Sequence, residues 1–306
     1  MKILLALAIV LFAQCTGIGQ ADQRFTSFEV ALKAAEKVKW LDLVCEDIPS
    51  ISQHIDKLPN LASLYLTGCE LEELPAVIGQ IGSLELLNVQ DNNLQSLPTA
   101  LKSLNKLTVA NLRNNNFTAL PEVLVSLPKL REIDLSGNQP LKLAQTLSLL
   151  SRVQKLDLLY LSGLHITTIP SEIEELRLLE ELHLSNNPDL DLVNAFAALS
   201  NLPNPKILVL ADNQISSIPA EISLLKQLNG LVLDNDPNIE MEALTTHLKQ
   251  LSNLKVLLLR NNKLTQLPEK LDGLSNLAVL EFSGNNFPES EQARIKALLP
   301  NTKVVF

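Results

Sequence analysis

Aliphatic residues recur along the chain in a pattern that repeats as a unit. The stretches LELLNVQDNNLQSLP (84–98) and LKVLLLRNNKLTQLP (254–268) share the frame L-x-x-L-x-L-x-x-N-x-L. Positions 4 and 6 of this frame are aliphatic, whereas positions 3, 5 and 7 vary, and such alternation is typical of a short β-strand with one buried face. In the first stretch Leu87 and Val89 are expected to face the interior, and Asn88 the opposite side.

Eleven units in this frame follow one another at spacings of 23 or 26 residues, and we number them 1 to 11 in chain order. Their first residues are Val38, Leu61, Leu84, Leu107, Leu130, Leu156, Leu179, Pro205, Leu228, Leu254 and Leu277. One unit alone cannot bury enough apolar surface to fold. The repeat therefore predicts a solenoid in which each unit covers its neighbours.

The frame, together with a Leu-Pro pair at positions 14 and 15, resembles the leucine-rich repeat family in its common 23-residue form, over about residues 38–306. The resemblance implies an α/β solenoid: a right-handed horseshoe with one curved parallel sheet on its concave face, and mixed helical and Leu-Pro segments on its convex face. Most proteins of this family are binding modules. This form of the repeat is also abundant in secreted and surface proteins of bacteria.

Position 9 is asparagine in most units, at Asn92, Asn115, Asn138, Asn187, Asn213, Asn262 and Asn285. An asparagine side chain offers both a donor and an acceptor, so a stacked column of them can satisfy the backbone groups of the turn that leaves each strand. Glu46, Cys69, Leu164 and Asp236 stand at this position in the other units. Because leucine offers neither group, we expect a reorganised turn in unit 6, whereas Asp236 keeps the acceptor.

Units 5, 7 and 9 are 26 residues long and lack the Leu-Pro pair. They carry an extra residue after position 9, and apolar residues then return at helical spacing, as Leu143, Leu147 and Leu150 do. We therefore expect helices on the convex side of these three units. Tighter Leu-Pro segments are expected in units 6, 8 and 10.

The two ends of the solenoid would expose a core face, so caps are expected around the eleven repeats at 38–288. Residues 22–37 carry helically spaced apolar residues behind Thr26 or Ser27, which are suitable N-caps. Residues 289–306 predict a helix followed by a last short strand.

A short basic start and the apolar run ILLALAIVLFA at 3–13 open the chain. The run is shorter than the ~20 residues of a membrane-spanning helix, so no membrane insertion is expected. It favours a cleaved secretory signal peptide over residues 1–21, with a buried N-terminal helix as the alternative. Cleavage after Gly19 or Ala21 would make the protein secreted, periplasmic or attached to the cell surface.

The chain has three cysteines. Cys15 raises the alternative of a lipid anchor, although FAQC matches the Leu-small-small-Cys lipobox poorly. Cys45 and Cys69 are too few for a disulfide framework and lack the spacing of a zinc knuckle. The sequence leaves open whether these two cysteines pair.

Composition and motifs narrow the class of function. A net charge of -9 argues against nucleic acid or an anionic membrane as partner, since both bind clustered lysine and arginine. The sequence has no glycine-rich phosphate loop, nucleophile elbow or zincin motif, and no histidine has a second histidine or cysteine at metal-ligand spacing. We therefore expect no catalytic residues, no metal, no cofactor and no enzymatic activity.

The varying positions 3 and 5 are the expected binding surface. From unit 8 onwards they become apolar, at Ile207, Val209, Val232, Val256, Leu258 and Val279. A contiguous apolar zone on one face is typical of a protein-binding hot spot, although β-branched residues also suit any strand. Arg260 borders the zone, and Tyr160 and His183 share the face, so these three are predicted partner contacts. Acidic neighbours such as Glu181 leave a metal or pH-sensitive site at His183 as the less favoured alternative.

Two functions fit these observations. The predicted one is a non-enzymatic, secreted recognition module that binds a protein or peptide partner on the concave face. The alternative is an intracellular signalling scaffold that resembles the Ras-interacting leucine-rich repeat proteins. A processed N-terminus near Gln20 or Asp22 would select the first.

Overall fold

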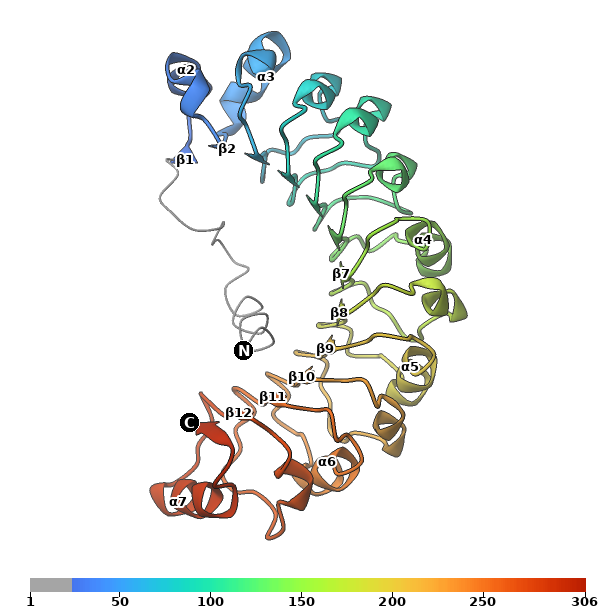
Figure 1. Cartoon of the computed structure of the whole chain (residues 1–306), viewed down its shortest axis with the longest axis vertical. Helices are drawn as coiled ribbons and strands as arrows, with labels where there is room; N and C mark the ends of the chain where they lie inside the picture. The colour runs from blue at the N-terminus through green and yellow to red at the C-terminus, as the bar shows by residue number, and fades with distance from the viewer. Residues whose placement is uncertain (1–23) are drawn as a thin grey trace.

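The computed structural model describes residues 24–306, in which thirteen strands form one parallel sheet and follow one another in chain order. The strands are β1 (Arg24–Phe25), β2 (Trp40–Asp42), β3 (Ser63–Tyr65), β4 (Leu86–Asn88), β5 (Val109–Asn111), β6 (Glu132–Asp134), β7 (Leu158–Tyr160), β8 (Glu181–His183), β9 (Ile207–Val209), β10 (Gly230–Val232), β11 (Val256–Leu258), β12 (Val279–Glu281) and β13 (Lys303–Val305). They lie along the inner side of an arc whose outer side carries the helices (Figure 1). The predicted α/β horseshoe is therefore confirmed. The predicted signal peptide at 1–21 and Cys15 lie outside the described residues.

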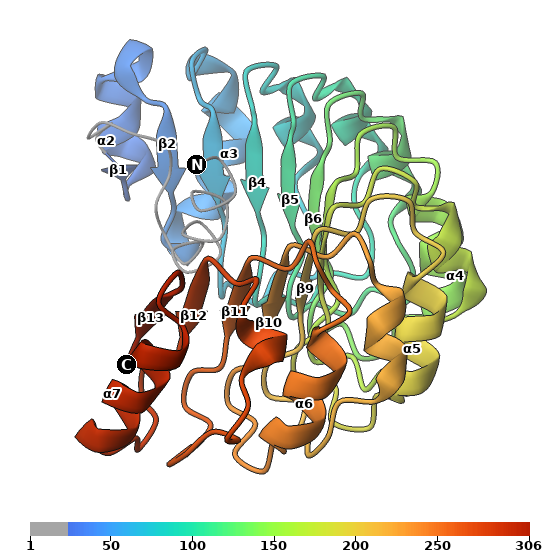
Figure 2. The same ribbon diagram turned by 60° about the horizontal axis from the view of Figure 1, so that its bottom comes forward.

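Each repeat contributes its positions 3 to 5 as a strand, and equivalent positions pair across the sheet. Leu87 pairs with Leu64 on one side and with Ala110 on the other. All three side chains are fully buried, because position 4 points into the core between the sheet and the convex segments. Figure 2 shows the neighbouring strands side by side. Positions 3 and 5 therefore form two continuous rows on the concave face.

The convex side mixes α-helices with 3₁₀ segments. The α-helices are α2 (Phe28–Lys33), α3 (Ile48–His54), α4 (Leu143–Leu150), α5 (Leu192–Leu199), α6 (Met241–Leu248) and α7 (Glu289–Leu298). The 3₁₀ segments are η1 (Ala35–Lys37), η2 (Cys45–Asp47), η3 (Ile55–Lys57), η4 (Ala76–Gln80), η5 (Thr99–Ser103), η6 (Glu122–Ser126), η7 (Ser171–Glu175), η8 (Ala220–Leu224) and η9 (Asp272–Leu274). α4, α5 and α6 belong to units 5, 7 and 9, and η7, η8 and η9 to units 6, 8 and 10, so the predicted alternation is confirmed.

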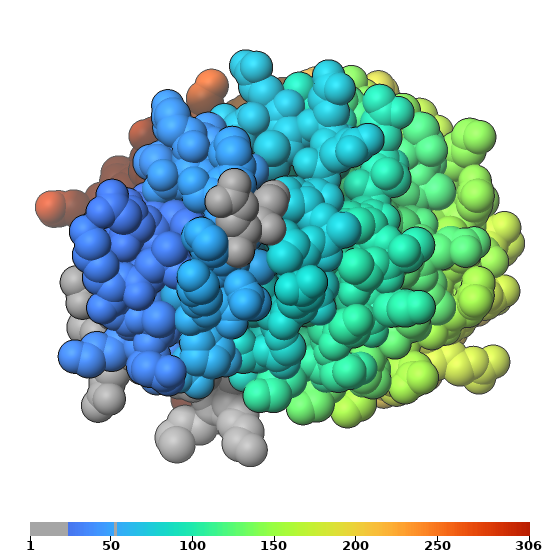
Figure 3. All heavy atoms as spheres, turned by 90° about the horizontal axis from the view of Figure 1, so that it is seen from above, coloured from blue at the N-terminus to red at the C-terminus, as the bar shows by residue number. Residues whose placement is uncertain are grey.

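The ends of the core are covered by short elements. β1, which the sequence did not predict, pairs with β2, and Phe28 and Ala31 of α2 are buried. The N–H of Phe28 donates to a carboxylate oxygen of Asp47 at 2.8 Å. The first backbone N–H of α2 therefore has its hydrogen-bond acceptor in η2, while the side chain of Ser27 makes no capping hydrogen bond. At the other end, α7 and β13 follow the last unit, and β13 pairs with β12. Figure 3 shows how closely the N-terminal units pack against one another.

Position 8 adopts a left-handed backbone in every unit from 2 to 11, with φ between 50 and 76°. The residues are Gly68, Asp91, Asn114, Gly137, Gly163, Asn186, Asp212, Asn235, Asn261 and Gly284. All ten are glycine, asparagine or aspartate, the residue types that enter this region at least cost. This turn bends the chain from the sheet towards the convex side.

The asparagines at position 9 hold these turns together across units. Nδ2 of Asn115 donates to the carbonyls of Val89 (2.9 Å) and Leu112 (3.1 Å), and Oδ1 accepts the N–H of Leu94 at 3.0 Å. Leu94 occupies position 11 of the preceding unit. One side chain thus satisfies buried backbone groups of two neighbouring units, which is the arrangement that the repeat of asparagine at this position predicts.

Unit 6 keeps the same turn, although Leu164 stands at position 9. Gly163 has a φ of 64°, and the N–H of Leu164 donates to Oδ1 of Asn187 at 3.0 Å. In unit 2 the N–H of Cys69 donates to Asn92 at the same distance. The prediction of a reorganised turn in unit 6 is therefore wrong, because the acceptor for the N–H of Leu164 comes from the following unit.

Unit 5 accommodates the missing asparagine of unit 6. Its position 11 is Pro140, which has no N–H to donate. The N–H of Asn138 turns back to the carbonyl of Leu135, at 3.4 Å. Leucine at position 164 therefore leaves no buried N–H of unit 5 without an acceptor.

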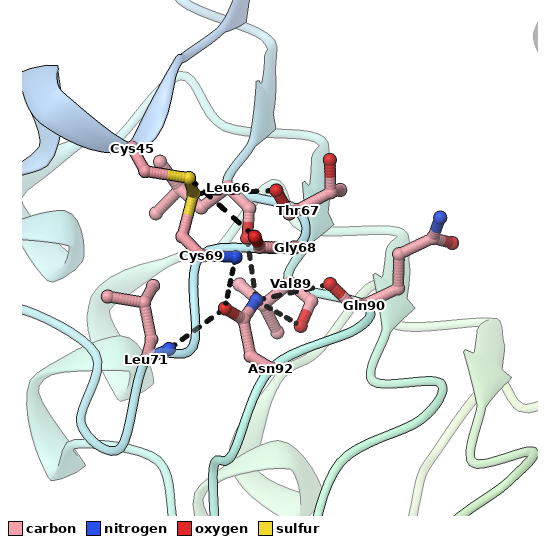
Figure 4. Close-up of a disulfide and its surroundings, with 9 residues drawn as sticks. All are labelled: Cys45, Leu66, Thr67, Gly68, Cys69, Leu71, Val89, Gln90 and Asn92. Carbon is pink, nitrogen blue, oxygen red and sulfur yellow. Dashed lines mark hydrogen bonds between the residues drawn. A yellow bond between two sulfur atoms is a disulfide. The ribbon is translucent and has the colours of Figure 1, made fainter.

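Cys45 and Cys69 form a disulfide that joins the first two units. Their Cα atoms lie 5.2 Å apart, and 24 residues separate them in sequence. Figure 4 shows the bridge beside Asn92, whose Oδ1 accepts the N–H groups of Cys69 and Leu71. The bridge thus lies at the place that asparagine occupies in the later units. It answers the question of pairing that the sequence left open.

Candidate partner-binding face

Positions 3 and 5 of β6 to β11 form two parallel rows on the concave face. The position 3 row reads Glu132, Leu158, Glu181, Ile207, Gly230 and Val256, and the position 5 row reads Asp134, Tyr160, His183, Val209, Val232 and Leu258. The register therefore divides this face into a polar half on β6 to β8 and an apolar half on β9 to β11.

The apolar half brings the predicted apolar residues together. Five of them form one cluster, hereafter the apolar cluster, consisting of Ile207, Val209, Val232, Val256 and Leu258, and Val279 packs against it. The cluster is separate from the core, and within the whole 306-residue chain its members are 2 to 7% exposed. Gly230 contributes no side chain between Ile207 and Val256, so the row holds backbone alone at this place beside Val232, hereafter the gap.

The polar half carries a group of titratable and aromatic side chains, hereafter the acidic–aromatic group: Glu132, Asp134, Tyr160, Glu181 and His183. The rings of Tyr160 and His183 lie 4.1 Å apart between centroids and are tilted by 34°. Nε2 of His183 lies 2.8 Å from Oε1 of Glu181, and Tyr160 hydrogen-bonds with Glu132. The structure therefore joins the two predicted contacts Tyr160 and His183 to three carboxyl groups.

Two carboxyl groups of the acidic–aromatic group have a raised pKa. Burial, followed by the charges of Glu181 and Asp134, raises the pKa of Glu132 to about 7. Burial also raises the pKa of Asp134, although hydrogen bonds from Ser136 oppose the rise. Within residues 24–306, no lysine or arginine forms an ion pair with Glu132, Asp134 or Glu181. Arg131 and Arg113 act on this group through their charge alone, so no ion pair with a lysine or arginine neutralises it within that range.

Arg260 borders the apolar cluster but is already paired. Its Nε donates to Oδ2 of Asp234 at 2.8 Å, and its backbone N–H donates to Oδ1 of the same residue at 2.7 Å. The Asp234 side chain is 5% exposed and that of Arg260 29%. The guanidinium therefore serves first to compensate a buried carboxylate, and only part of it is open to a partner.

Several polar residues of the face have a structural role that the sequence analysis missed. Oδ1 of Asn88 accepts the N–H of Gln90, and Oδ1 of Asn111 accepts that of Arg113, both at 3.0 Å. Asparagine and aspartate commonly bond the backbone two residues on. The signal was an asparagine or aspartate at position 5 in three consecutive units, 3 to 5. These side chains cap the strand ends, so they are poor candidates for free contact groups.

The described part of the chain holds no group of three or more histidine, cysteine, aspartate or glutamate side chains arranged to bind a metal ion. None of the helices between residues 24 and 306 is both long and apolar enough to cross a membrane.

Comparison with known proteins places these features in context. Residues 82–139 and 253–274 match two family models that are both described as leucine rich repeat. No curated protein matches the chain. A leucine-rich repeat protein of Leptospira interrogans is 22% identical over 93% of this chain and 100% of its own, with a TM-score of 0.35.

Two internalins of Listeria monocytogenes are also similar. One is 22% identical over 90% of this chain and 92% of its own, with a TM-score of 0.49. The other, an internalin C2, is 26% identical over 66% of this chain and 82% of its own, with the same TM-score. Leucine-rich repeats generally mediate protein–protein interaction and typically act as non-enzymatic scaffolds. The matched segments, the recurring frame and one strand per unit in a single sheet show that the chain is built of leucine-rich repeats.

Proposed function

We propose that this protein is a secreted, non-enzymatic recognition module that binds a protein or peptide partner on the concave face of its sheet. The apolar cluster on β9 to β11 carries the proposal. Stacking of the units accounts for the apolar residues at position 4, which belong to the core. It does not require aliphatic residues at position 5 of three consecutive units and at position 3 of two of them. A contiguous apolar area outside the core is typical of an interaction site.

Two features support a location outside the cytoplasm. The apolar run at 3–13 is typical of a secretory signal peptide, and the Cys45–Cys69 disulfide is typical of an oxidising compartment. The proposal concerns the processed chain, from about residue 22 onwards. Mass spectrometry of the protein from the producing cell is expected to show an N-terminus near Gln20 or Asp22. An intact N-terminus would favour the intracellular scaffold, and a lipid on Cys15 would indicate an anchored form.

The test of the binding face is the double variant Val232→Asp with Leu258→Asp. In a crosslinking pull-down from the producing cell, the variant is expected to lose the partner that the wild-type protein captures, because a carboxylate buried in an apolar interface costs several kcal/mol. Circular dichroism checks that the variant is folded. Capture of the same partner by the folded variant would show that the apolar cluster is not the contact.

A matched control carries the same charges on the other side of the molecule. Leu178 and Leu224 lie on the convex side and are 53% and 48% exposed. The double variant Leu178→Asp with Leu224→Asp is expected to keep the partner. Loss of binding in both double variants would point to the added charge itself rather than to the concave face.

A further inference from the structure

The two halves of the concave face adjoin directly, so one ligand can touch both. In the register, Glu181 neighbours Ile207 and His183 neighbours Val209. Gly230 lies three strands from the centre of the acidic–aromatic group on β7, which is about 14 Å at the usual strand spacing. An extended segment spans that distance with about four residues.

We propose that the partner docks through a segment that places an aliphatic side chain over Gly230 and an arginine or lysine side chain on the acidic–aromatic group. This inference rests on the proposed function and names the chemistry of its partner. The two contacts lie on one sheet face, so a single continuous segment can make both.

Charge complementarity selects a basic residue. Three carboxyl groups lie close together, and no lysine or arginine between residues 24 and 306 pairs with them. The rings of Tyr160 and His183, tilted by 34° to each other, border the carboxyl groups, and a guanidinium can lie against an aromatic ring. A cation from outside would therefore meet two kinds of favourable contact at this place and would relieve the repulsion between the carboxylates.

The gap at Gly230 selects an aliphatic residue. Glycine is unfavourable within strands, and it often marks a place where another chain approaches closely. Ile207 and Val256 on the adjoining strands lie about 9.6 Å apart at the usual spacing, and no side chain of β10 lies between them in the position 3 row. Val232 borders the gap, so an aliphatic side chain there would contact apolar groups on three sides.

The probe is a library of random 12-residue peptides displayed on phage, selected on the processed protein and then measured as free peptides by fluorescence anisotropy. The selected peptides are expected to carry arginine or lysine about four residues from leucine, isoleucine or valine. Binding peptides without a basic residue would overturn this inference but leave the proposed function standing. A selection without binders, or binders indifferent to Val232→Asp with Leu258→Asp, would overturn both.

Two variants test the contacts separately. Glu132→Gln with Glu181→Gln removes the charges with little change of shape. It is expected to lower the affinity for a basic peptide about tenfold or more and to leave the affinity for the neutral analogue of that peptide unchanged. Gly230→Val fills the gap and suits the strand, and it is expected to weaken all selected peptides. Exposed Glu122 and Glu175 supply the control, Glu122→Gln with Glu175→Gln, which is expected to leave affinity unchanged. Equal loss in test and control would overturn the assignment to Glu132 and Glu181.

Affinity for a basic peptide is also expected to depend on pH. The charged or titratable groups that act on Glu132 are Arg131, Asp134, Asp157, Tyr160 and Glu181, and Arg113 and His183 act on neighbouring Asp134. Because the pKa of Glu132 is about 7, this carboxyl group loses its proton between pH 6 and pH 8, and the affinity is expected to rise over that interval. The rise should be absent in Glu132→Gln. The same rise in that variant would assign the effect to another group and contradict a role for Glu132.

Discussion

Replacing Asp236 with asparagine is expected to stabilise the fold, by an amount that grows as pH rises from about 4 through 6. Asp236 stands at position 9 of unit 9 and is fully buried. Its Oδ1 accepts the N–H groups of Asn213 (3.1 Å) and Ile215 (2.9 Å), as the asparagines elsewhere in the column do. Its Oδ2 has no hydrogen-bond partner among the described residues. In the neighbouring unit the corresponding atom is Nδ2 of Asn213, which donates to the carbonyls of Leu184 and Leu210.

The size and sign of the effect follow from the pKa of this group. Burial raises the pKa of Asp236 to about 6, from an ordinary 3.8, although the backbone N–H groups oppose the rise. A difference of about two pKa units corresponds to about 3 kcal/mol. Because the folded state holds the proton more tightly than the unfolded state, the stability of the wild-type protein falls as pH rises from about 4 through 6. Asparagine does not titrate, and its Nδ2 can donate where Oδ2 finds no donor.

The assay is urea unfolding of the wild-type protein and of Asp236→Asn, followed by circular dichroism at pH 4.5 and pH 8. The stability gained by the variant is expected to be about 2 kcal/mol larger at pH 8 than at pH 4.5. Other titrating groups are shared by the two proteins, so they cancel in the difference between the variant and the wild type at each pH. A gain for Asp236→Asn that is the same at both pH values, or a loss at pH 8, would refute the reasoning.

Three further predictions concern the turns and the disulfide. Asn115→Leu leaves the buried N–H of Leu94 without an acceptor and is expected to lower the free energy of unfolding in urea by about 1–3 kcal/mol, whereas exposed Asn116→Ala should change it little. An unchanged unfolding midpoint in Asn115→Leu would contradict a structural role of the asparagine column. Gly284→Ala places a Cβ 2.0 Å from Oδ1 of Asn261 at a φ of 76° and is expected to lower the free energy of unfolding by about 1–3 kcal/mol. Gly82 has open space around it, so Gly82→Ala should leave stability unchanged, and equal effects of the two substitutions would contradict the turn geometry. Reduction of the Cys45–Cys69 bridge is expected to lower the free energy of unfolding of the wild-type protein by about 3 kcal/mol. The double variant Cys45→Ser with Cys69→Ser has no bridge to reduce, so an equal shift of its unfolding midpoint by the reductant would contradict this prediction.

The sequence predicts the architecture well because the repeat presents the same physical problem eleven times. Each strand carries one buried side chain between two others that face outwards, as Leu87 does between Leu86 and Asn88, and the period of 23 or 26 residues decides which convex segment follows. Position 8 offered a further signal, since glycine, asparagine and aspartate alone occupy it in units 2 to 11. That restriction predicts the left-handed turn, and it becomes visible only when the units are compared column by column.

The binding face was harder to predict, because its residues are not repeated. Sequence spacing placed Tyr160 and His183 on one face, but it did not predict the 4.1 Å distance between their tilted rings or the bond between His183 and Glu181. It also placed Arg260 at the border of the apolar zone without predicting its pairing with Asp234. Such contacts depend on side-chain conformations across strands that are 23 or 26 residues apart in sequence, and an alternating pattern carries no information about them.

Unit 6 shows that departures from the frame must be considered in pairs of adjacent units. Leu164 alone predicts a defect, because leucine can neither donate nor accept. In the other two 26-residue units the N–H at position 9 donates to position 9 of the next unit, as Asn187 does to Asn213 at 2.6 Å. Leu164 cannot accept the corresponding N–H of Asn138, which turns back to the carbonyl of Leu135 at 3.4 Å. In unit 8, which has 23 residues, the N–H of Ile215 also donates to Asp236 of the next unit. A side chain at position 9 is therefore constrained by the N–H groups of the unit before it, and the length of that unit decides which of them it meets. Neither Leu164 nor Asp236 can be judged from its own unit alone.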